Sequence, residues 1–286
     1  MSLIVKYIPL PVLSLFVDEN TKRSENIKLY YYKHPKNNPN YLNGKLNFGD
    51  YLSDFIVEGV TKKKVVYTQL EKADLVAIGS IMSFLDNTWH KVKVWGTGHM
   101  YDKDLPVTNI NVEILALRGH LSLAKYPNIR NIPLGDPALL TSRYIKPSKY
   151  KLNKVGVIPH YIDKEDPRIH ALKNDPRFMV INVFDSPIRV AKDISSCKFV
   201  ISSSLHGVIV AHSYLVPAAW VELSNKVLGD GFKFRDYYSV FDVPPNKVTI
   251  EDIINSPFDE THYFSPEKVD LLFICSELEK ALIQSF

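Results

Sequence analysis

A histidine follows three serines at the joint between an apolar strand and an apolar helix. The stretch ISSSLHGVIVAHSYLVP, residues 201–217, places His206 at the predicted start of that helix. The free N–H groups of a helix start favour anions. A histidine side chain has an ordinary pKa of about 6.5, so it can donate or accept a proton near neutral pH. The pattern therefore predicts an anion site with a proton-transfer group beside it.

Two cationic side chains are expected near this histidine. Ligands of open parallel sheets bind beyond the carboxyl ends of the strands, so the residues just past each predicted strand form the candidate site. Arg118 offers a planar fork for a phosphate or carboxylate, and Lys226 follows the strand after the His206 helix. A single polar residue or glycine at a strand end is usually an ordinary turn residue. The three protonatable groups together indicate an anion site.

The residues next to His206 have structural as well as functional interpretations. Ser203 or Ser204 is expected to cap the helix with its side chain, a role that needs no ligand. Gly207 would let a ligand approach the backbone closely. Gly79 and Ser80, which follow a strand earlier in the chain, extend the candidate anion site.

Two series of strands and helices are predicted to position these residues. The first has strands near 27–33, 63–68, 73–80, 92–98 and 113–119, and a helix with Asp50 as its predicted N-cap. The second has strands near 154–160, 178–184, 198–204 and 217–223, and helices near 187–196 and 205–215. Alternation of strands and helices with short joints is typical of parallel sheets.

The predicted class is therefore α/β, with two Rossmann-like domains that face a cleft in a GT-B-like arrangement. The polar, basic stretch 143–154 separates the two series, so we expect one domain over residues 1–148 and another over residues 149–286. A final helix, opened by Ser265 and Pro266, is expected to pack back across the body. Its predicted apolar stripe consists of Val269, Leu272, Phe273, Leu278 and Leu282.

The composition excludes several classes of protein. With 45% apolar residues the chain is not disordered, and its net charge of +4 comes from scattered lysines, which suits small anions and does not indicate nucleic acid. Cys197 and Cys275 lie far apart in apolar segments, which favours a reducing cytoplasm over a disulfide framework. Lys6 interrupts the apolar N-terminus, so we do not expect a signal peptide there. No run is long enough to span a bilayer, so any membrane association would be peripheral.

Eight short fragments follow one another along residues 47–238. They are NFGD (47–50), IGS (78–80), WGTG (95–98), LRG (117–119), LGDPALL (134–140), IPHY (158–161), SSSLHG (202–207) and FKFRDYY (232–238). In this combination the chain resembles the polysaccharide pyruvyl transferase family, and within it the branch of exopolysaccharide ketal-pyruvate transferases.

The resemblance implies an activity and a set of site residues. The donor would be phosphoenolpyruvate, the acceptor a sugar diol, and the product a cyclic pyruvate ketal with release of phosphate, without a cofactor or a metal. The family's functional residues fall on Arg118, His206 and Lys226. Many members carry an arginine where this chain has Ser204. Lys233 and Arg235 are the candidates to replace that charge.

Further roles follow from the chemistry of the donor and the acceptor. Histidine suits the proton donor that the enol carbon needs, and the two anionic groups of the donor should raise the pKa of His206. The residues expected at the acceptor are Trp95, His99, His160, Tyr161 and Tyr237. The acceptor is a glycan, free or linked to a lipid. We expect the reaction to take place in the cytoplasm. Whether it takes place at the inner face of the membrane stays an open alternative.

Two other functions remain open. One is a nucleotide-sugar glycosyltransferase of GT-B architecture, although Lys226 stands where such enzymes commonly have a carboxylate. The other is a non-catalytic component of polysaccharide assembly. The Asp-Lys-Asp stretch 102–104 is interpreted as a solvated turn, and His160, Asp163 and His170 are spaced too loosely for a metal site. The acceptor sugar, the hydroxyls that are bridged and the oligomeric state stay open.

Overall fold

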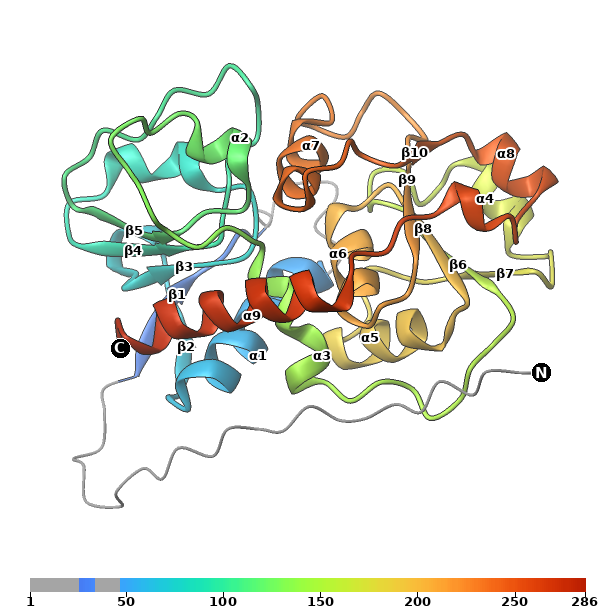
Figure 1. Cartoon of the computed structure of the whole chain (residues 1–286), viewed down its shortest axis with the longest axis horizontal. Coiled ribbons are helices and arrows are strands. Elements are labelled where there is room, and N and C mark those ends of the chain that lie inside the picture. Colours follow the sequence, from blue (N-terminus) through green and yellow to red (C-terminus); the bar gives the residue numbers. More distant parts are fainter. Residues whose placement is uncertain (1–25, 34–46) are drawn as a thin grey trace.

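The computed structural model describes residues 26–33 and 47–286, which form a mixed α/β fold with two parallel five-stranded sheets (Figure 1). The first sheet contains β1 (Ile27–Tyr30), β2 (Val65–Tyr67), β3 (Leu75–Val76), β4 (Val92–Trp95) and β5 (Val112–Ala116). The second contains β6 (Val155–Ile158), β7 (Phe178–Val180), β8 (Phe199–Ser202), β9 (Ala218–Val221) and β10 (Lys247–Val248). The segment that was tested for a signal peptide lies outside the described residues.

Both sheets have the same internal strand order. The first is ordered β2-β1-β3-β4-β5 and the second β10-β9-β8-β6-β7, so each reads 2-1-3-4-5 when its own strands are counted along the chain. This order occurs in doubly wound sheets, which bind ligands where the strand order reverses. The reversal lies between β1 and β3 in one sheet and between β6 and β8 in the other. The α/β class is confirmed, while the GT-B-like pairing of two Rossmann-like domains stays a prediction.

The strands are shorter than the predicted segments, and most are apolar. Every residue of β6, β8 and β9 is buried, as expected for parallel strands covered on both faces. The change from one sheet to the other falls between the end of β5 at residue 116 and the start of β6 at residue 155. The division into domains at residues 148 and 149 stays a prediction.

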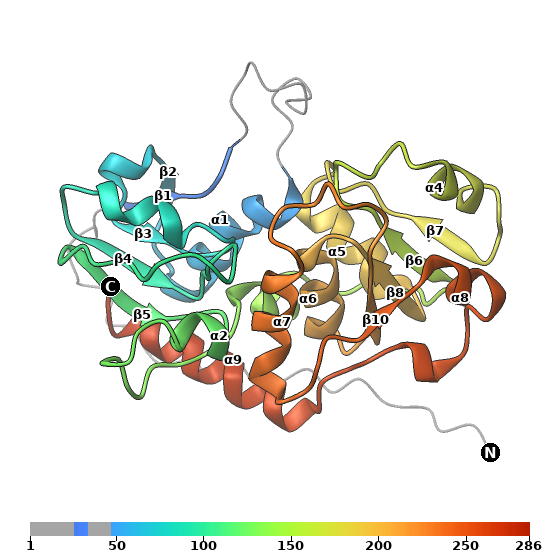
Figure 2. The same cartoon turned by 90° about the horizontal axis from the view of Figure 1, so that it is seen from above.

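The helices connect and cover the strands (Figures 1 and 2). They are α1 (Phe48–Thr61), α2 (His120–Leu123), α3 (Thr141–Tyr144), α4 (Pro167–Leu172), α5 (Pro187–Ser196), α6 (Leu205–Ser213), α7 (Phe232–Tyr238), α8 (Ile250–Asn255) and α9 (Lys268–Ile283). Short 3-10 helices are η1 (Leu70–Lys72), η2 (Met82–Asn87), η3 (Pro137–Leu140), η4 (Ser239–Phe241) and η5 (Glu260–His262). None of the described helices is long and apolar enough to span a membrane.

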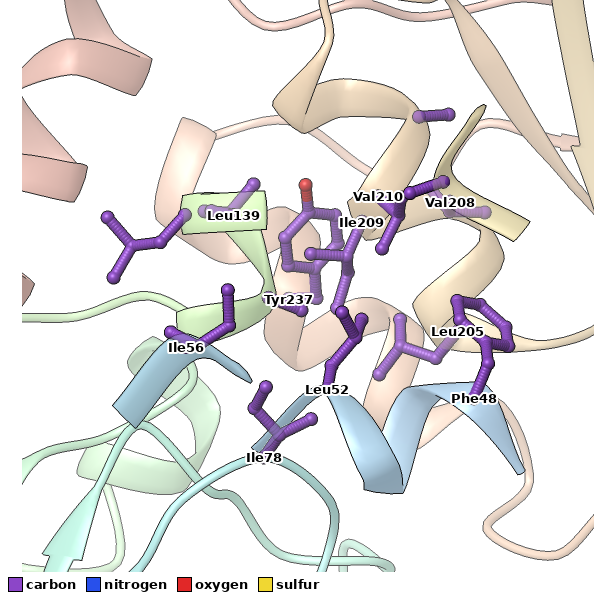
Figure 3. Packing of buried hydrophobic residues seen from close by; sticks show 14 of the residues in the cluster. Phe48, Leu52, Ile56, Ile78, Leu139, Leu205, Val208, Ile209, Val210 and Tyr237 are labelled. Carbon is purple, nitrogen blue, oxygen red and sulfur yellow. The ribbon is translucent and has the colours of Figure 1, made fainter. Parts of the chain in front are cut away.

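One hydrophobic core joins the two sheets. Figure 3 shows Leu52 of α1, Leu139 of η3 and Ile209 of α6 packed together, with Tyr237 of α7 beside them. All four side chains are fully buried. Because α1 precedes the second strand of one sheet and α6 follows β8 of the other, this packing fixes the two carboxyl edges relative to each other. A shift of one sheet would expose apolar surface that the shared core now buries.

The helix α9 lies across the first sheet, and its buried face differs from the predicted one (Figure 1). The buried residues are Leu271, Ile274, Cys275, Leu278 and Leu282. Val269 and Phe273, which were expected to be buried, are 70% and 67% exposed. Four consecutive apolar residues, 271–274, let the sequence fit more than one stripe. The buried face is the one that lies against Trp95, whose Nε1 donates to the carbonyl of Leu278 at 2.8 Å.

Candidate active site

The start of α1 brings the first half of the chain to the second. Asn47 is the N-cap, since its side chain accepts a hydrogen bond from the backbone N–H of Gly49 at 3.0 Å. The N–H of Phe48 donates to the carbonyl of Val183, beyond β7, at 2.8 Å. The prediction of Asp50 as the N-cap is therefore wrong. With Asn47 in that role, the Asp50 carboxylate is free to face the site, where it lies beside Gly79.

His206, in the first turn of α6, packs directly against α1. A Cβ atom placed on Gly49 would lie 2.0 Å from His206 Nδ1, so only glycine leaves room for this ring. On its other side, His206 Nε2 lies 3.9 Å from Asp136 Oδ2. Two of the fragments in the sequence, NFGD and LGDPALL, thus enclose the histidine of the third, SSSLHG.

We expect Gly49→Ala to displace the His206 ring and to lower the free energy of unfolding by about 1 to 3 kcal/mol, because the added methyl group overpacks the contact. Urea-induced unfolding measures the change. Ser53→Ala, one turn later on the same helix, is the matched control, because Ser53 Oγ is buried and has no hydrogen-bond partner among the described residues. Equal stability of both variants would contradict the packing argument.

Arg118 is fully buried and bound on several sides by protein groups. Its Nε donates to Asp236 Oδ2 at 2.9 Å, one Nη to Ser80 Oγ at 2.6 Å and the other to the carbonyl of His99 at 2.6 Å. The prediction that the Arg118 guanidinium is open to the donor needs correction, because the carboxylate of Asp236 on α7 already accepts a hydrogen bond from it. The positive charge of Arg118 still reaches His206, whose pKa it helps to lower.

Lys233, and not Lys226, is the lysine that lies at His206. Lys226 is exposed, and its backbone N–H donates to Ser224 Oγ at 3.2 Å. Lys233, in the first turn of α7, is partly buried and helps to lower the pKa of His206. The expected convergence of Lys226 on the anion site is thus not found. Arg235, on the same helix as Lys233, is exposed and donates to the carbonyl of Asp230 at 2.8 Å.

The serines hold the end of β8 and do not cap α6. Ser204 is the N-cap residue, but its side chain makes no capping hydrogen bond. Ser203 Oγ donates to Asp163 Oδ2 at 2.8 Å and accepts from the N–H of His160 at 2.8 Å. A Cβ on Gly207 would lie 2.3 Å from Ser202 Oγ, so this glycine permits close packing of helix on strand. The expected side-chain cap and the expected approach of a ligand to Gly207 are both corrected.

Three of the residues expected at the acceptor lie in the core. Trp95, His99 and Tyr237 are fully buried, so their rings are not open to a sugar face. His160 and Tyr161 lie past β6 at the strand reversal, partly buried, with ring centroids 4.2 Å apart. These two keep the position expected of acceptor residues.

Five groups form what we term the central cluster, namely Asp50, Arg118, Asp136, His206 and Lys233. Burial raises the pKa of Asp50 and of Asp136 to about 7. Burial, together with Lys233 and Arg118, lowers the pKa of His206 to about 3. Burial and Arg118 lower the pKa of Lys233 to about 8. Perturbed groups that gather at strand ends are typical of functional sites.

Two acidic members of the central cluster were missed as site residues. Asp50 and Asp136 stand in NFGD and LGDPALL, which were recognised only as fragments of the resemblance. Asp163 was considered only as a metal ligand, whereas it accepts from Ser203 and from Ser224 Oγ at 2.8 and 2.5 Å. For Asp50 and Asp163 the signal was an aspartate close to a predicted helix start or strand end, and for Asp136 it was the fragment LGDPALL.

A pocket opens beside the central cluster. Its polar lining includes Ser203, Ser224 and Lys233, and its apolar lining includes Trp220 and Phe234. A larger cavity of about 380 Å³ lies at the amino ends of β6 and β8, lined by Lys151, Cys197, Lys198 and apolar residues. That cavity lies at the amino-terminal edge of the second sheet, and His206 lies at the opposite, carboxyl edge. Because ligands of open parallel sheets bind at the carboxyl edge, we assign the site to the pocket at Lys233.

Comparison with known proteins gives a family model and two similar proteins. A family model described as polysaccharide pyruvyl transferase matches residues 111–225, which include Arg118, Asp136 and His206. The uncharacterized protein L143 of Acanthamoeba polyphaga mimivirus is 28% identical over 244 residues, 76% of this chain and 82% of that protein. The succinoglycan biosynthesis protein ExoV of Rhizobium meliloti (strain 1021) is 24% identical over 216 residues, 71% of this chain and 65% of that protein.

The resemblance to the polysaccharide pyruvyl transferase family is thereby confirmed, and this family is one of transferases. The matched segment ends before Lys226 and Lys233, so the assignment of the lysine depends on the geometry of α7.

Proposed function

We propose that the protein transfers the pyruvyl group of phosphoenolpyruvate to a sugar diol of an exopolysaccharide or capsule precursor, as a cyclic ketal, with release of phosphate. The observation that carries the proposal is the position of His206, with Asp136 Oδ2 3.9 Å from its Nε2 and with Lys233 and Arg118 close enough to lower its pKa. This arrangement combines a proton-transfer group with positive charge at a strand reversal, where an open parallel sheet binds ligands. The similarity to a succinoglycan biosynthesis protein supports a glycan acceptor.

The reaction divides into steps that these groups can serve. The enol carbon of the donor gains a proton, one sugar hydroxyl attacks the neighbouring carbon, and phosphate leaves with the electrons of the C–O bond. The second hydroxyl then closes the ketal and gives its proton to the departing phosphate. His206 supplies the proton to the enol carbon. Lys233 stabilises the negative charge of the phosphate, and the buried charge of Arg118 adds to the same field. Asp50, with its raised pKa, accepts the proton of the attacking hydroxyl.

The acceptor would lie on the side of His160 and Tyr161. Their rings lie against each other at a tilt of 35° at the carboxyl end of β6, across the strand reversal from His206. A glycan carried on a lipid would bring the reaction to the inner face of the membrane, where phosphoenolpyruvate is present. No cofactor is required by these steps.

We expect phosphoenolpyruvate to raise the Tm of the protein, and UDP and GDP sugars to leave it unchanged. A ligand at 100 times its Kd adds about 2.7 kcal/mol to the free energy of unfolding, which differential scanning fluorimetry resolves. Lys233→Met should lose most of this shift, while Lys226→Met serves as the matched control and should keep it. Stabilisation by a nucleotide sugar alone would overturn the proposal in favour of a glycosyltransferase.

A further inference from the structure

Asp136 and His206 face each other as two buried polar atoms without hydrogen-bond partners among the described residues. Asp136 is fully buried, and its Oδ1 accepts from the N–H of Ala138 at 2.9 Å. Its Oδ2 has no such partner, nor does His206 Nε2, and the two atoms lie 3.9 Å apart. An unpartnered buried polar atom is costly. Two such atoms side by side therefore indicate a functional pair that closes to a hydrogen bond.

The orientation of the ring decides which nitrogen can meet a substrate. Nε2 is buried and faces Asp136, while Nδ1 lies on the side of Gly49. The His206 side chain keeps 13% of its surface exposed. Nδ1 packs against Gly49, but unlike Nε2 it is not one of the fully buried unpartnered atoms of the described residues, so it is the ring nitrogen left for a small substrate.

We infer that Asp136 is a positioning residue that holds Nε2 of His206 and stores the proton that the histidine delivers from Nδ1. This inference rests on the proposed function and adds a residue to its site. In the resting pair Asp136 is a neutral acid that faces Nε2 of a neutral imidazole, which carries its hydrogen on Nδ1, and the pair closes to a hydrogen bond when the donor binds. When an anionic donor arrives, the proton of Asp136 passes to Nε2. The ring becomes an imidazolium beside a carboxylate, and its Nδ1–H can be transferred to the enol carbon.

The charges around the pair support this distribution of the proton. Burial raises the pKa of Asp136 to about 7 and lowers that of His206 to about 3, so the neutral form of each group is favoured in the protein alone. The titratable and charged groups that act on the pair are Arg118, Lys233, Asp236, Asp50 and Tyr237. The phosphate and carboxylate of the donor would oppose the two cations and favour the imidazolium.

Thermal stability tests the stored proton without any substrate. The raised pKa of Asp136 contributes stability below pH about 4 that is lost as the pH rises to about 7. The lowered pKa of His206 contributes stability above pH about 6.5 that is lost as the pH falls to about 3. Between pH about 4 and 6.5 the two pH dependences of stability cancel. The pair then holds one proton in the folded state, on Asp136, and one in the unfolded state, on His206.

Each single variant should therefore show the pH dependence of stability that the other, unchanged residue causes. Relative to the parent protein, Asp136→Asn should lose Tm as the pH falls from 7 to 4, and His206→Gln should lose Tm as the pH rises from 4 to 7. Asparagine can still accept from the N–H of Ala138, so Asp136→Asn keeps the cap. The double variant should differ from the sum of the single variants, since the groups are in contact. Slopes of the same sign, or additive changes, would overturn the inference.

Steady-state turnover gives the second readout. Asp136→Asn should lower kcat for phosphate release by about 10²- to 10⁴-fold with little change in the KM for phosphoenolpyruvate, since the proton supply is lost and the cations remain. Asp54→Asn alters a partly buried carboxylate on α1 that is not part of the central cluster, so it is the control and should keep kcat. Full activity of Asp136→Asn would overturn the inference. A parent protein without turnover would instead refute the proposed function, and the Tm experiment would still decide the pair.

Discussion

Arg118→Met is expected to lower the free energy of unfolding by about 3 to 5 kcal/mol. The substitution leaves the Asp236 carboxylate, which is fully buried, without the guanidinium that now lies 2.9 Å away. Ser122 would remain the principal partner, because its N–H and Oγ donate to Asp236 at 2.7 and 2.6 Å. Since Arg118 follows β5 and Asp236 lies on α7, the loss would also loosen the contact between the two halves. Equilibrium unfolding in urea measures the change.

The double variant Arg118→Met/Asp236→Leu separates the ion pair from simple loss of packing. Removing both charges leaves no buried unpaired ion, so we expect the double variant to recover part of the stability that Arg118→Met loses. Asp236→Leu alone should be destabilised as well, since it leaves the Arg118 cation buried. A double variant that is as unstable as the sum of the single variants would show that the pair is not the cause.

His206→Gln is expected to lower kcat for pyruvyl transfer by about 10²- to 10⁴-fold while leaving the affinity for phosphoenolpyruvate close to that of the parent protein. Glutamine fills much of the space of the ring but does not supply a proton to carbon. Lys233 and the field of Arg118 remain, so binding of the anionic donor should persist. Phosphate release measures turnover, and the Tm shift with phosphoenolpyruvate measures binding.

His212 offers a matched control on the same helix. It is fully buried, and its ring nitrogens contact the Tyr237 hydroxyl at 2.8 Å and the carbonyl of Phe264 at 3.0 Å. His212→Gln should therefore lower Tm and spare kcat. If the two variants lost turnover to the same extent, His206 would have no special place in the chemistry. The pH dependence of kcat adds a further test, since the limb that reports His206 should vanish in His206→Gln.

The sequence was sufficient for the class of fold and for the edge of the sheets at which the candidate site residues lie. Apolar runs such as β6 and β8 form buried parallel strands because they must be covered on both faces. The helix predicted over residues 187–196 has the same bounds in the structure. His206 lies at the joint between strand and helix, where the local pattern placed it.

The partners of the charged residues could not be obtained in the same way. The sequence placed Lys226 beside His206, because it follows β9 by a few residues, whereas the chain carries Lys233 there on the first turn of α7. Arg118 lies past β5 as expected, but Asp236, far along the chain, occupies its fork. Burial of Trp95 and Tyr237 likewise depends on helices from other parts of the chain.

Local pattern and tertiary packing thus determined different properties of this protein. Strand, helix and turn signals act over a few residues, so the sequence by itself determined the parallel α/β order and the positions at the strand ends. Contact between His206, Gly49 and Asp136 joins segments that are far apart in the chain, and only the packing of α1, η3 and α6 into one core brings them together. The pKa values of these groups follow from that burial, because desolvation is a property of the folded surroundings and not of the residue type.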